Sequence, residues 1–164
     1  IYTSDDLEGI ELAGALKNIY AIISGYCHSL NVGENAIGLI LTRSMAEMSS
    51  FAVNKGANPT TFLGLAGMGD LVATCFSKLS RNYQFGWAIG EGLDVEAAKS
   101  KVGQVAEGLN TIKIIHNEIS NTEIKMPLVL GMHEILFNNG SKELLLEQII
   151  NSDIHVDVSF DVES

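Results

Sequence analysis

An almost unbroken apolar segment runs from Ile10 to Ile23, near the start of the chain. The helical pattern runs from Asp5 to about Leu30, and Ser4, Asp5 or Asp6 can cap its start. The apolar positions are too numerous for a single amphipathic stripe, so we expect a long helix that is central and buried on most sides. A transmembrane helix is not expected, because the segment is too short and polar residues interrupt it.

The rest of the chain shows the periodicity of helices, and strand-like alternation occurs only in the terminal segment 154–158. A glycine-rich turn is expected at residues 64–70. The further helices that we expect cover residues 35–54, 60–65, 70–76, 81–91, 95–101, 107–120, 127–138 and 141–151. The sequence therefore predicts an all-α protein in which residues 1–164 form a single multi-helix domain.

Composition and charge narrow the classes of partner. The formal net charge of −10 repels nucleic-acid backbones and anionic lipid, so we expect neither a nucleic-acid partner nor membrane insertion. Cys27 and Cys75 form no Cys-x-x-Cys motif, which favours a reducing compartment such as the cytoplasm. Because the chain begins at Ile1 and not at Met, we expect it to be a piece of a longer protein. No metal site is predicted, since the histidines are scattered without ligand spacing: His28, His116, His133 and His155.

Lys17 is the first candidate for a chemical role. It is the only residue with a formal charge between Glu11 and Glu34, and it stands in the most apolar predicted helix. Burying an unpaired ammonium group costs free energy, so such a lysine is suited to proton transfer or to binding an anion. An equally weighted alternative is a lysine whose stem packs on apolar surface while its ammonium group reaches water. Asn18 points about 100° further around the helix and can border the same cleft.

The segment Gly67-Met68-Gly69-Asp70 is a second candidate. It lacks the Gly-x-Gly-x-x-Gly order of a dinucleotide-binding loop, and no predicted strand precedes it. We expect its glycines to let the backbone turn tightly and to leave Asp70 at the start of a helix. Taken alone, the segment favours a simple helix cap over a functional role for Asp70.

A third candidate lies where a loop enters a predicted helix, at Ser80, Arg81 and Asn82, with Thr74 shortly before them. A guanidinium group, side-chain donors and free backbone N–H groups at such a position suit a phosphate group. Taken alone, the segment favours a serine cap followed by a surface arginine. Glu107 is similarly open to two interpretations, as a carboxylate at a helix start or as a ligand contact.

The order and spacing of these segments carry more information than any one of them. The segments are ELAGALKN at 11–18, GLAGMGDL at 64–71, TC at 74–75, LSRN at 79–82, QVAEG at 104–108 and MP at 126–127. Together they resemble the C-terminal domain of bacterial NAD(P)-dependent glycerol-3-phosphate dehydrogenases, over a stretch from about Asp5 to Phe137. Departures occur at Ala13, Lys78 and Ala106, none of which is assigned a chemical role. The resemblance implies a helical fold like that of the C-terminal domain of 6-phosphogluconate dehydrogenase.

The resemblance also implies roles for the residues of the proposed substrate site. Lys17 would be the general acid/base that exchanges a proton with the C2 oxygen of sn-glycerol 3-phosphate or dihydroxyacetone phosphate. The hydride would pass between this substrate and NAD or NADP. Asp70 would orient Lys17 and bond the substrate hydroxyls, and Ser80, Arg81 and Asn82 would hold the phosphate.

Further contacts follow from the same resemblance. Thr74 and Asn18 would be secondary substrate contacts, and Arg81, Val105 and Glu107 would contact the dinucleotide. The main cradle of the cofactor belongs in this family to an N-terminal Rossmann domain, which this chain lacks. The chain alone is therefore expected to be inactive, and its product in the whole protein would serve phospholipid synthesis.

The alternative to an enzyme domain is a helical module without catalysis that serves interaction or dimerisation. A homodimer is compatible with both the enzyme and the module. Lys17, Asp70 and Arg81 discriminate between them: one shared cleft supports the enzyme, and three separate solvated sites support the module. Another dehydrogenase of similar two-domain build, such as a 6-phosphogluconate or ketopantoate enzyme, would lack the Ser-Arg-Asn loop in this context. The preference for NAD or NADP does not follow from these residues.

Overall fold

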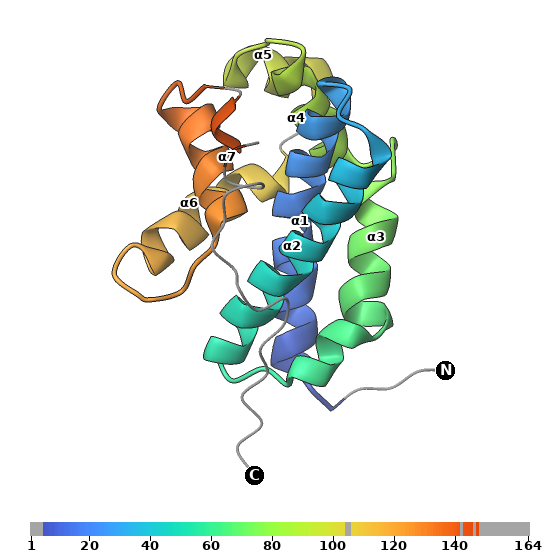
Figure 1. The fold of residues 1–164 in the computed structure, drawn as a ribbon, viewed down its shortest axis with the longest axis vertical. Helices are drawn as coiled ribbons and strands as arrows, with labels where there is room; N and C mark the ends of the chain where they lie inside the picture. The colour runs from blue at the N-terminus through green and yellow to red at the C-terminus, as the bar shows by residue number, and fades with distance from the viewer. Residues whose placement is uncertain (1–4, 104–105, 142, 146, 148–164) are drawn as a thin grey trace.

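The computed structural model describes residues 5–103, 106–141, 143–145 and 147 of the chain. One long helix, α1 (Leu7–Ser29), runs through the molecule, and shorter helices pack around it (Figure 1). Every regular element of the described residues is helical, which confirms the predicted all-α fold class. The other elements are α2 (Glu34–Asn54), the 3₁₀-helix η1 (Pro59–Leu63), the π-helical turn η2 (Leu65–Gly69), α3 (Asp70–Cys75), α4 (Arg81–Gly90), α5 (Val95–Val102), α6 (Glu107–Ile119) and α7 (Pro127–Phe137).

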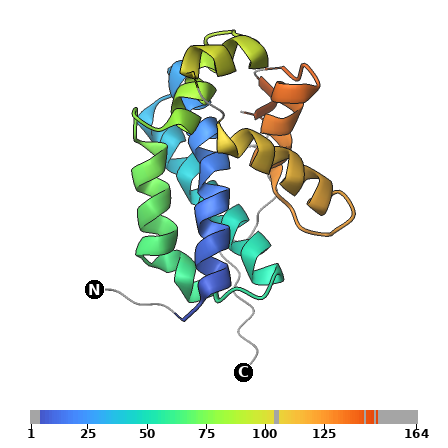
Figure 2. The same cartoon turned by 180° about the vertical axis from the view of Figure 1, so that it is seen from behind.

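The apolar run at the start of the chain forms the central helix, as predicted. Asp6 caps α1, because its carboxylate accepts a hydrogen bond from the Gly9 N–H at 3.0 Å. Residues 19–27 are all buried, and they cover the full circumference of the helix. The first half of α1 keeps an exposed face that includes Glu11. Figure 2 shows α1 from behind, with α3 along one side and α6 crossing away from it on the other.

Two glycines set the close approach of α1 and α4. A Cβ atom on Gly25 would lie 2.0 Å from the Tyr83 carbonyl oxygen, and one on Gly86 would lie 1.9 Å from the Ile22 carbonyl oxygen. Backbone atoms of the opposite helix occupy the space that a Cβ atom would need at each glycine. Neither position can therefore accept a larger residue unless one of the two helices moves. The crossing brings the first turn of α4 to the same pocket as Asn18 of α1.

The glycine-rich segment expected to be a turn is instead the π-helical turn η2, which continues directly into α3. A Cβ atom on Gly67 would lie 2.3 Å from the Phe62 Cα, so the backbone of η2 packs directly on η1. Gly69 is the N-cap of α3, and Asp70 is already a helical residue. The interpretation of Asp70 as a cap was therefore wrong, and its side chain is available for another contact.

Glu47 is a buried carboxylate that joins α2 to the start of α7. Its side chain is 2% exposed, and its two oxygens accept hydrogen bonds from the Leu128 N–H at 2.7 Å and the Tyr20 hydroxyl at 3.3 Å. Burial raises the pKa of Glu47 to about 8, while the hydrogen bonds from Leu128, Val129 and Tyr20 oppose the shift. The Glu47 carboxyl group thus fixes where α7 begins, and burial favours its neutral form over a charge in the core.

No helix of the described residues is long and apolar enough to cross a membrane. Residues 143–145 are helical, in agreement with part of the helix expected at 141–151. Part of the rest of that predicted helix lies outside the described residues. The strand expected at 154–158 lies wholly outside them.

Candidate active site

Lys17 and Asp70 form an ion pair, with 2.5 Å between Lys17 Nζ and Asp70 Oδ2. The lysine comes from the middle of α1, and the aspartate is the first residue of α3. The Lys17 side chain is 25% exposed and the Asp70 side chain is 37% exposed, so the pair can be reached from solvent. The ammonium group is thus held in place by a counter-charge while remaining accessible to a bound molecule.

Thr74 stands one helical turn after Asp70. Its hydroxyl donates a hydrogen bond to the Asp70 carbonyl oxygen at 2.6 Å and lies 3.5 Å from Asp70 Oδ1. The short bond to the backbone fixes the Thr74 rotamer, and the longer contact lies on the carboxylate oxygen that Lys17 does not use. Thr74 therefore helps to hold the Asp70 side chain in place beside Lys17, whichever ligand binds to the two residues.

Asn82 joins three helices at the edge of the second group of predicted residues. The Gly108 N–H at the start of α6 donates to Asn82 Oδ1 at 3.0 Å, and Asn82 Nδ2 donates to Asn18 Oδ1 at 3.0 Å. Because a backbone N–H can only donate, the first bond fixes the orientation of the amide and hence the direction of the second. A Cβ atom on Gly108 would lie 2.5 Å from the Asn18 carbonyl oxygen, so this glycine is required for the contact.

A polar pocket of about 290 Å³ opens beside this amide chain. Ser80 caps α4 at its rim, since the Ser80 hydroxyl accepts a hydrogen bond from the Tyr83 N–H at 3.4 Å. The pocket therefore combines the positive end of a helix with a guanidinium group, which is a combination that attracts an anion. Its lining residues are Asn18, Leu79, Ser80, Arg81, Asn82 and Glu107.

The predicted site residues fall into two adjoining groups. Lys17, Asp70 and Thr74 form one group, and the pocket forms the other; neither Lys17 nor Asp70 is among the pocket's lining residues. The two groups meet on α1, where Lys17 and Asn18 are consecutive and point about 100° apart. A single cleft that joins Lys17, Asp70 and Arg81 around one ligand stays a prediction. Val105 lies outside the described residues.

No role was predicted for Gly108, although it lies in the segment QVAEG at 104–108. Its function in the site is steric and depends on the backbone, because its N–H is a donor and its missing side chain leaves room for α1. A glycine directly after the predicted helix start at Glu107 was the available signal. No sequence signal indicated that Glu47 is buried, because its position in α2 looks like that of any other polar residue in a helix.

Comparison with known proteins places these features in a family. Residues 6–147 match a family model described as NAD-dependent glycerol-3-phosphate dehydrogenase C-terminus. A glycerol-3-phosphate dehydrogenase (NAD(P)+) of Pseudomonas savastanoi pv. phaseolicola is 49% identical over 160 residues, which cover 98% of this chain and 47% of that protein. The chain thus spans about half the length of the curated relatives that it matches.

Solved structures agree with the sequence match. The crystal structure of a glycerol-3-phosphate dehydrogenase from Coxiella burnetii aligns with a TM-score of 0.84 and 38% identity, over 92% of this chain and 46% of that chain. The corresponding enzyme of Saccharomyces cerevisiae aligns with a TM-score of 0.77 and 30% identity, over 88% of this chain and 42% of that chain. With the family match over most of its length, this chain belongs to the family of NAD-dependent glycerol-3-phosphate dehydrogenase C-terminal domains.

Proposed function

We propose that this chain is the substrate-binding and proton-transferring part of an NAD(P)-dependent glycerol-3-phosphate dehydrogenase. The reaction would be the reversible reduction of dihydroxyacetone phosphate by NADH or NADPH to sn-glycerol 3-phosphate, a precursor of phospholipids. The observation that carries the proposal is the accessible Lys17–Asp70 ion pair beside a pocket that combines Arg81 with the start of α4. The family membership reported above supports the same reaction.

In this reaction Lys17 would act as the general acid. As hydride reaches C2 of dihydroxyacetone phosphate, the C2 carbonyl oxygen gains negative charge and takes a proton from Lys17 Nζ, giving the C2 hydroxyl. The lysine is left neutral and regains a proton from solvent, which its 25% exposure permits. Asp70 would hold the ammonium group in position for the transfer through their ion pair.

The pocket would receive the phosphate. Arg81 would supply a charged donor, Ser80 would contribute from its capping position, and the positive end of the α4 helix dipole would face the phosphate oxygens. Asn82 is 8% exposed and already bonded on both sides of its amide, so it would act chiefly by fixing Asn18 and Gly108 around the ligand.

The dinucleotide would lie over the same pocket and be held mainly by a Rossmann domain of the same protein. Arg81 would reach one of its phosphates, and Glu107 would accept a hydrogen bond from a hydroxyl; we propose a further contact from Val105. We also propose a cytoplasmic location, which the two buried free thiols of Cys27 and Cys75 support.

The direct test is the oxidation of NADH and NADPH by the full-length protein, followed by absorbance, on addition of dihydroxyacetone phosphate. Turnover that needs the phosphorylated ketone and is lost with dihydroxyacetone at the same concentration supports the proposal. A full-length protein that binds neither nucleotide and shows no turnover in either direction contradicts it.

A second candidate function is an interface, because large apolar side chains are exposed between η1 and the loop before α4. Leu63 is 65% exposed, Leu65 is 64% exposed and Leu79 is 88% exposed. Such exposed apolar side chains are typical of surfaces that pack on a partner. We propose that Leu79, the most exposed of the three, packs on the Rossmann domain or on a second copy, and sedimentation of the full-length protein with Leu79→Ser distinguishes the two.

A further inference from the structure

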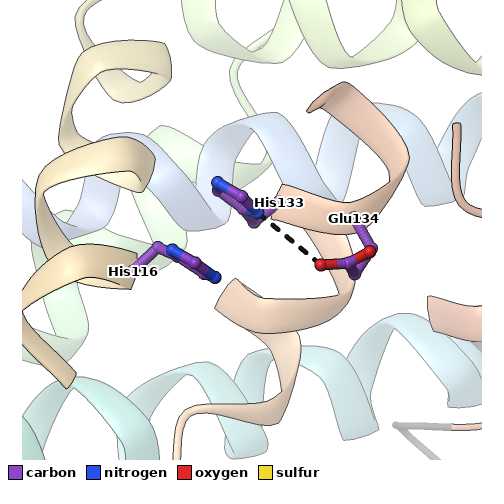
Figure 3. Close-up of side chains that lie close together, drawn as sticks. All are labelled: His116, His133 and Glu134. Carbon is purple, nitrogen blue, oxygen red and sulfur yellow. Dashed lines mark ion pairs between the residues drawn. The ribbon is translucent and has the colours of Figure 1, made fainter. Parts of the chain in front are cut away.

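Three potential metal ligands come together at the joint between α6 and α7, away from the residues of the candidate active site. His116 lies in the last turn of α6, and His133 and Glu134 lie in α7. One ligand atom from each residue can be chosen so that all three lie within 4.8 Å of one another. Figure 3 shows the two imidazole rings facing each other, with the Glu134 carboxylate beside His133.

The two histidines have buried nitrogen atoms that the described part of the chain leaves unsatisfied. His116 Nδ1 and His133 Nδ1 are both buried, and neither has a hydrogen-bond partner among the described residues. Glu134 Oε1 lies 3.8 Å from His133 Nδ1, which is too long for a hydrogen bond. A buried polar atom without a partner costs free energy and calls for a water molecule or an ion in its place.

We propose that His116, His133 and Glu134 bind a divalent first-row transition-metal ion, for which Zn²⁺ is the best fit. Two imidazoles and one carboxylate form a ligand set that zinc accepts, with a water molecule as the fourth ligand. Calcium and magnesium are poor candidates, since both prefer oxygen ligands. Nickel, cobalt and copper share the preference for imidazole and would bind the same atoms.

Binding requires only a local adjustment of the side chains. The rings are stacked at 3.6 Å between centroids with 7° between their planes, so their lone pairs are parallel and at least one ring must turn. Ligand atoms of a tetrahedral zinc site lie about 3.4 Å apart, somewhat closer than the present spacing. Glu134 can follow the ion because its side chain is 43% exposed, and this exposure also gives the ion a route of entry.

Asn138 supports the carboxylate from the next turn of the helix. Its Nδ2 donates a hydrogen bond to Glu134 Oε1 at 2.9 Å, the oxygen that lies beside His133. Hydrogen bonds of this kind orient metal-ligating carboxylates. The bound ion would therefore tie the end of α6 to the middle of α7, and the other end of α6 carries Glu107 at the pocket.

The experiment titrates ZnCl₂ into the full chain, purified without a histidine tag, in buffer with excess Mg²⁺ to occupy oxygen-only sites. Heat of binding and the Tm are measured for the wild type and for His116→Gln, His133→Gln and Glu134→Gln. His28→Gln is the matched histidine control, because His28 lies in α1 with a backbone contact at 2.9 Å. Glu118→Gln is the matched carboxylate control on α6, where Glu118 pairs with Lys55.

The proposal predicts one Zn²⁺ per wild-type chain, with affinity at least ~10-fold weaker in each of the three ligand variants and unchanged in both controls. At the same concentration, Zn²⁺ should raise the Tm of the wild type and the controls more than that of the ligand variants, since an ion that binds only the folded chain stabilises it in proportion to its affinity. No saturable binding, or equal affinity in the ligand variants and controls, overturns the proposal. If a histidine variant fails to fold, Glu134→Gln decides the question, because it keeps an oxygen for Asn138 and changes a half-exposed position.

Discussion

Asp70 Oδ2 lies 2.5 Å from Lys17 Nζ although the two residues are 53 positions apart, and a π-helical turn leads the chain to this contact. The turn η2 removes Asp70 from the capping position and places it in the first turn of α3. Its carboxylate can therefore face α1. If Asp70 capped its own helix, its carboxylate oxygens would accept hydrogen bonds from backbone N–H groups. Fewer acceptor positions would then remain for Lys17.

Arg81→Ala should weaken recognition of the phosphate in the full-length protein. The lost charge-assisted hydrogen bonds should raise KM for dihydroxyacetone phosphate by about 10- to 100-fold. With dihydroxyacetone as substrate the penalty should be much smaller, because that substrate has no phosphate for Arg81 to bind. Steady-state kinetics with both ketones measures the difference, and an equal penalty on both would show that Arg81 does not hold the phosphate.

Gly25→Ala and Gly86→Ala should destabilise the fold, because each new methyl group would meet the backbone of the opposite helix within 2.0 Å. We expect a loss of about 1–3 kcal/mol or more in the free energy of unfolding, the scale of overpacking in a core. Gly14→Ala is the matched control on α1, since a Cβ atom there meets nothing within 4 Å. It should gain up to about 1 kcal/mol from helix propensity. Urea unfolding of the three variants compares them, and similar values for Gly14→Ala and Gly25→Ala would contradict the close approach of α1 and α4.

The free energy of unfolding should fall as pH rises, in part through Glu47. The pKa of this carboxyl is about 8 in the folded protein against 4.5 for an unperturbed group. The folded state therefore holds a proton that the unfolded state has released between these two values, and stability is lost as pH rises through that window. The loss should be on the order of a few kcal/mol.

Glu47→Gln should flatten this pH dependence. Its amide oxygen can still accept from the Leu128 N–H and its NH₂ group can donate to the Tyr20 hydroxyl, so the contacts survive without an ionisable group. Denaturant unfolding at several pH values between about 5 and 8 makes the comparison. If the free energy of unfolding of the wild type falls no more than that of the variant over this range, the raised pKa of Glu47 is contradicted.

Much of the fold follows from local pattern. The bounds of α2, α4, α5, α6 and α7 differ from the predicted ones by one residue or so, because caps and helical periodicity act over a few neighbouring positions. The π-helical turn could not be predicted, since glycines permit several backbone paths and the choice of η2 depends on packing against Phe62. Glu47 is also a tertiary effect, as its partner Leu128 belongs to another helix.

In the candidate site, too, some features follow from local sequence pattern and others arise only from packing between helices. A lone lysine in an apolar helix singled out Lys17 but left two interpretations open, and the structure pairs its ammonium group with Asp70. The bridge from Asn18 through Asn82 to Gly108 joins three helices, and no spacing in the sequence encodes it. The proximity of His116 and His133 likewise arises only when α6 and α7 pack together.

Turnover of dihydroxyacetone phosphate by full-length Lys17→Ala shows directly whether Lys17 transfers the proton. Lys17→Arg and the exposed Lys125→Ala are assayed beside it, after circular dichroism has shown that each variant is folded. We expect kcat to fall at least ~100-fold in Lys17→Ala, the scale of a positioned general acid. Lys17→Arg should not restore it, because a guanidinium group does not release its proton near neutrality, and Lys125→Ala should match the wild type. Near-normal turnover in Lys17→Ala would contradict the account and leave Lys17 as a residue that only packs and pairs with Asp70.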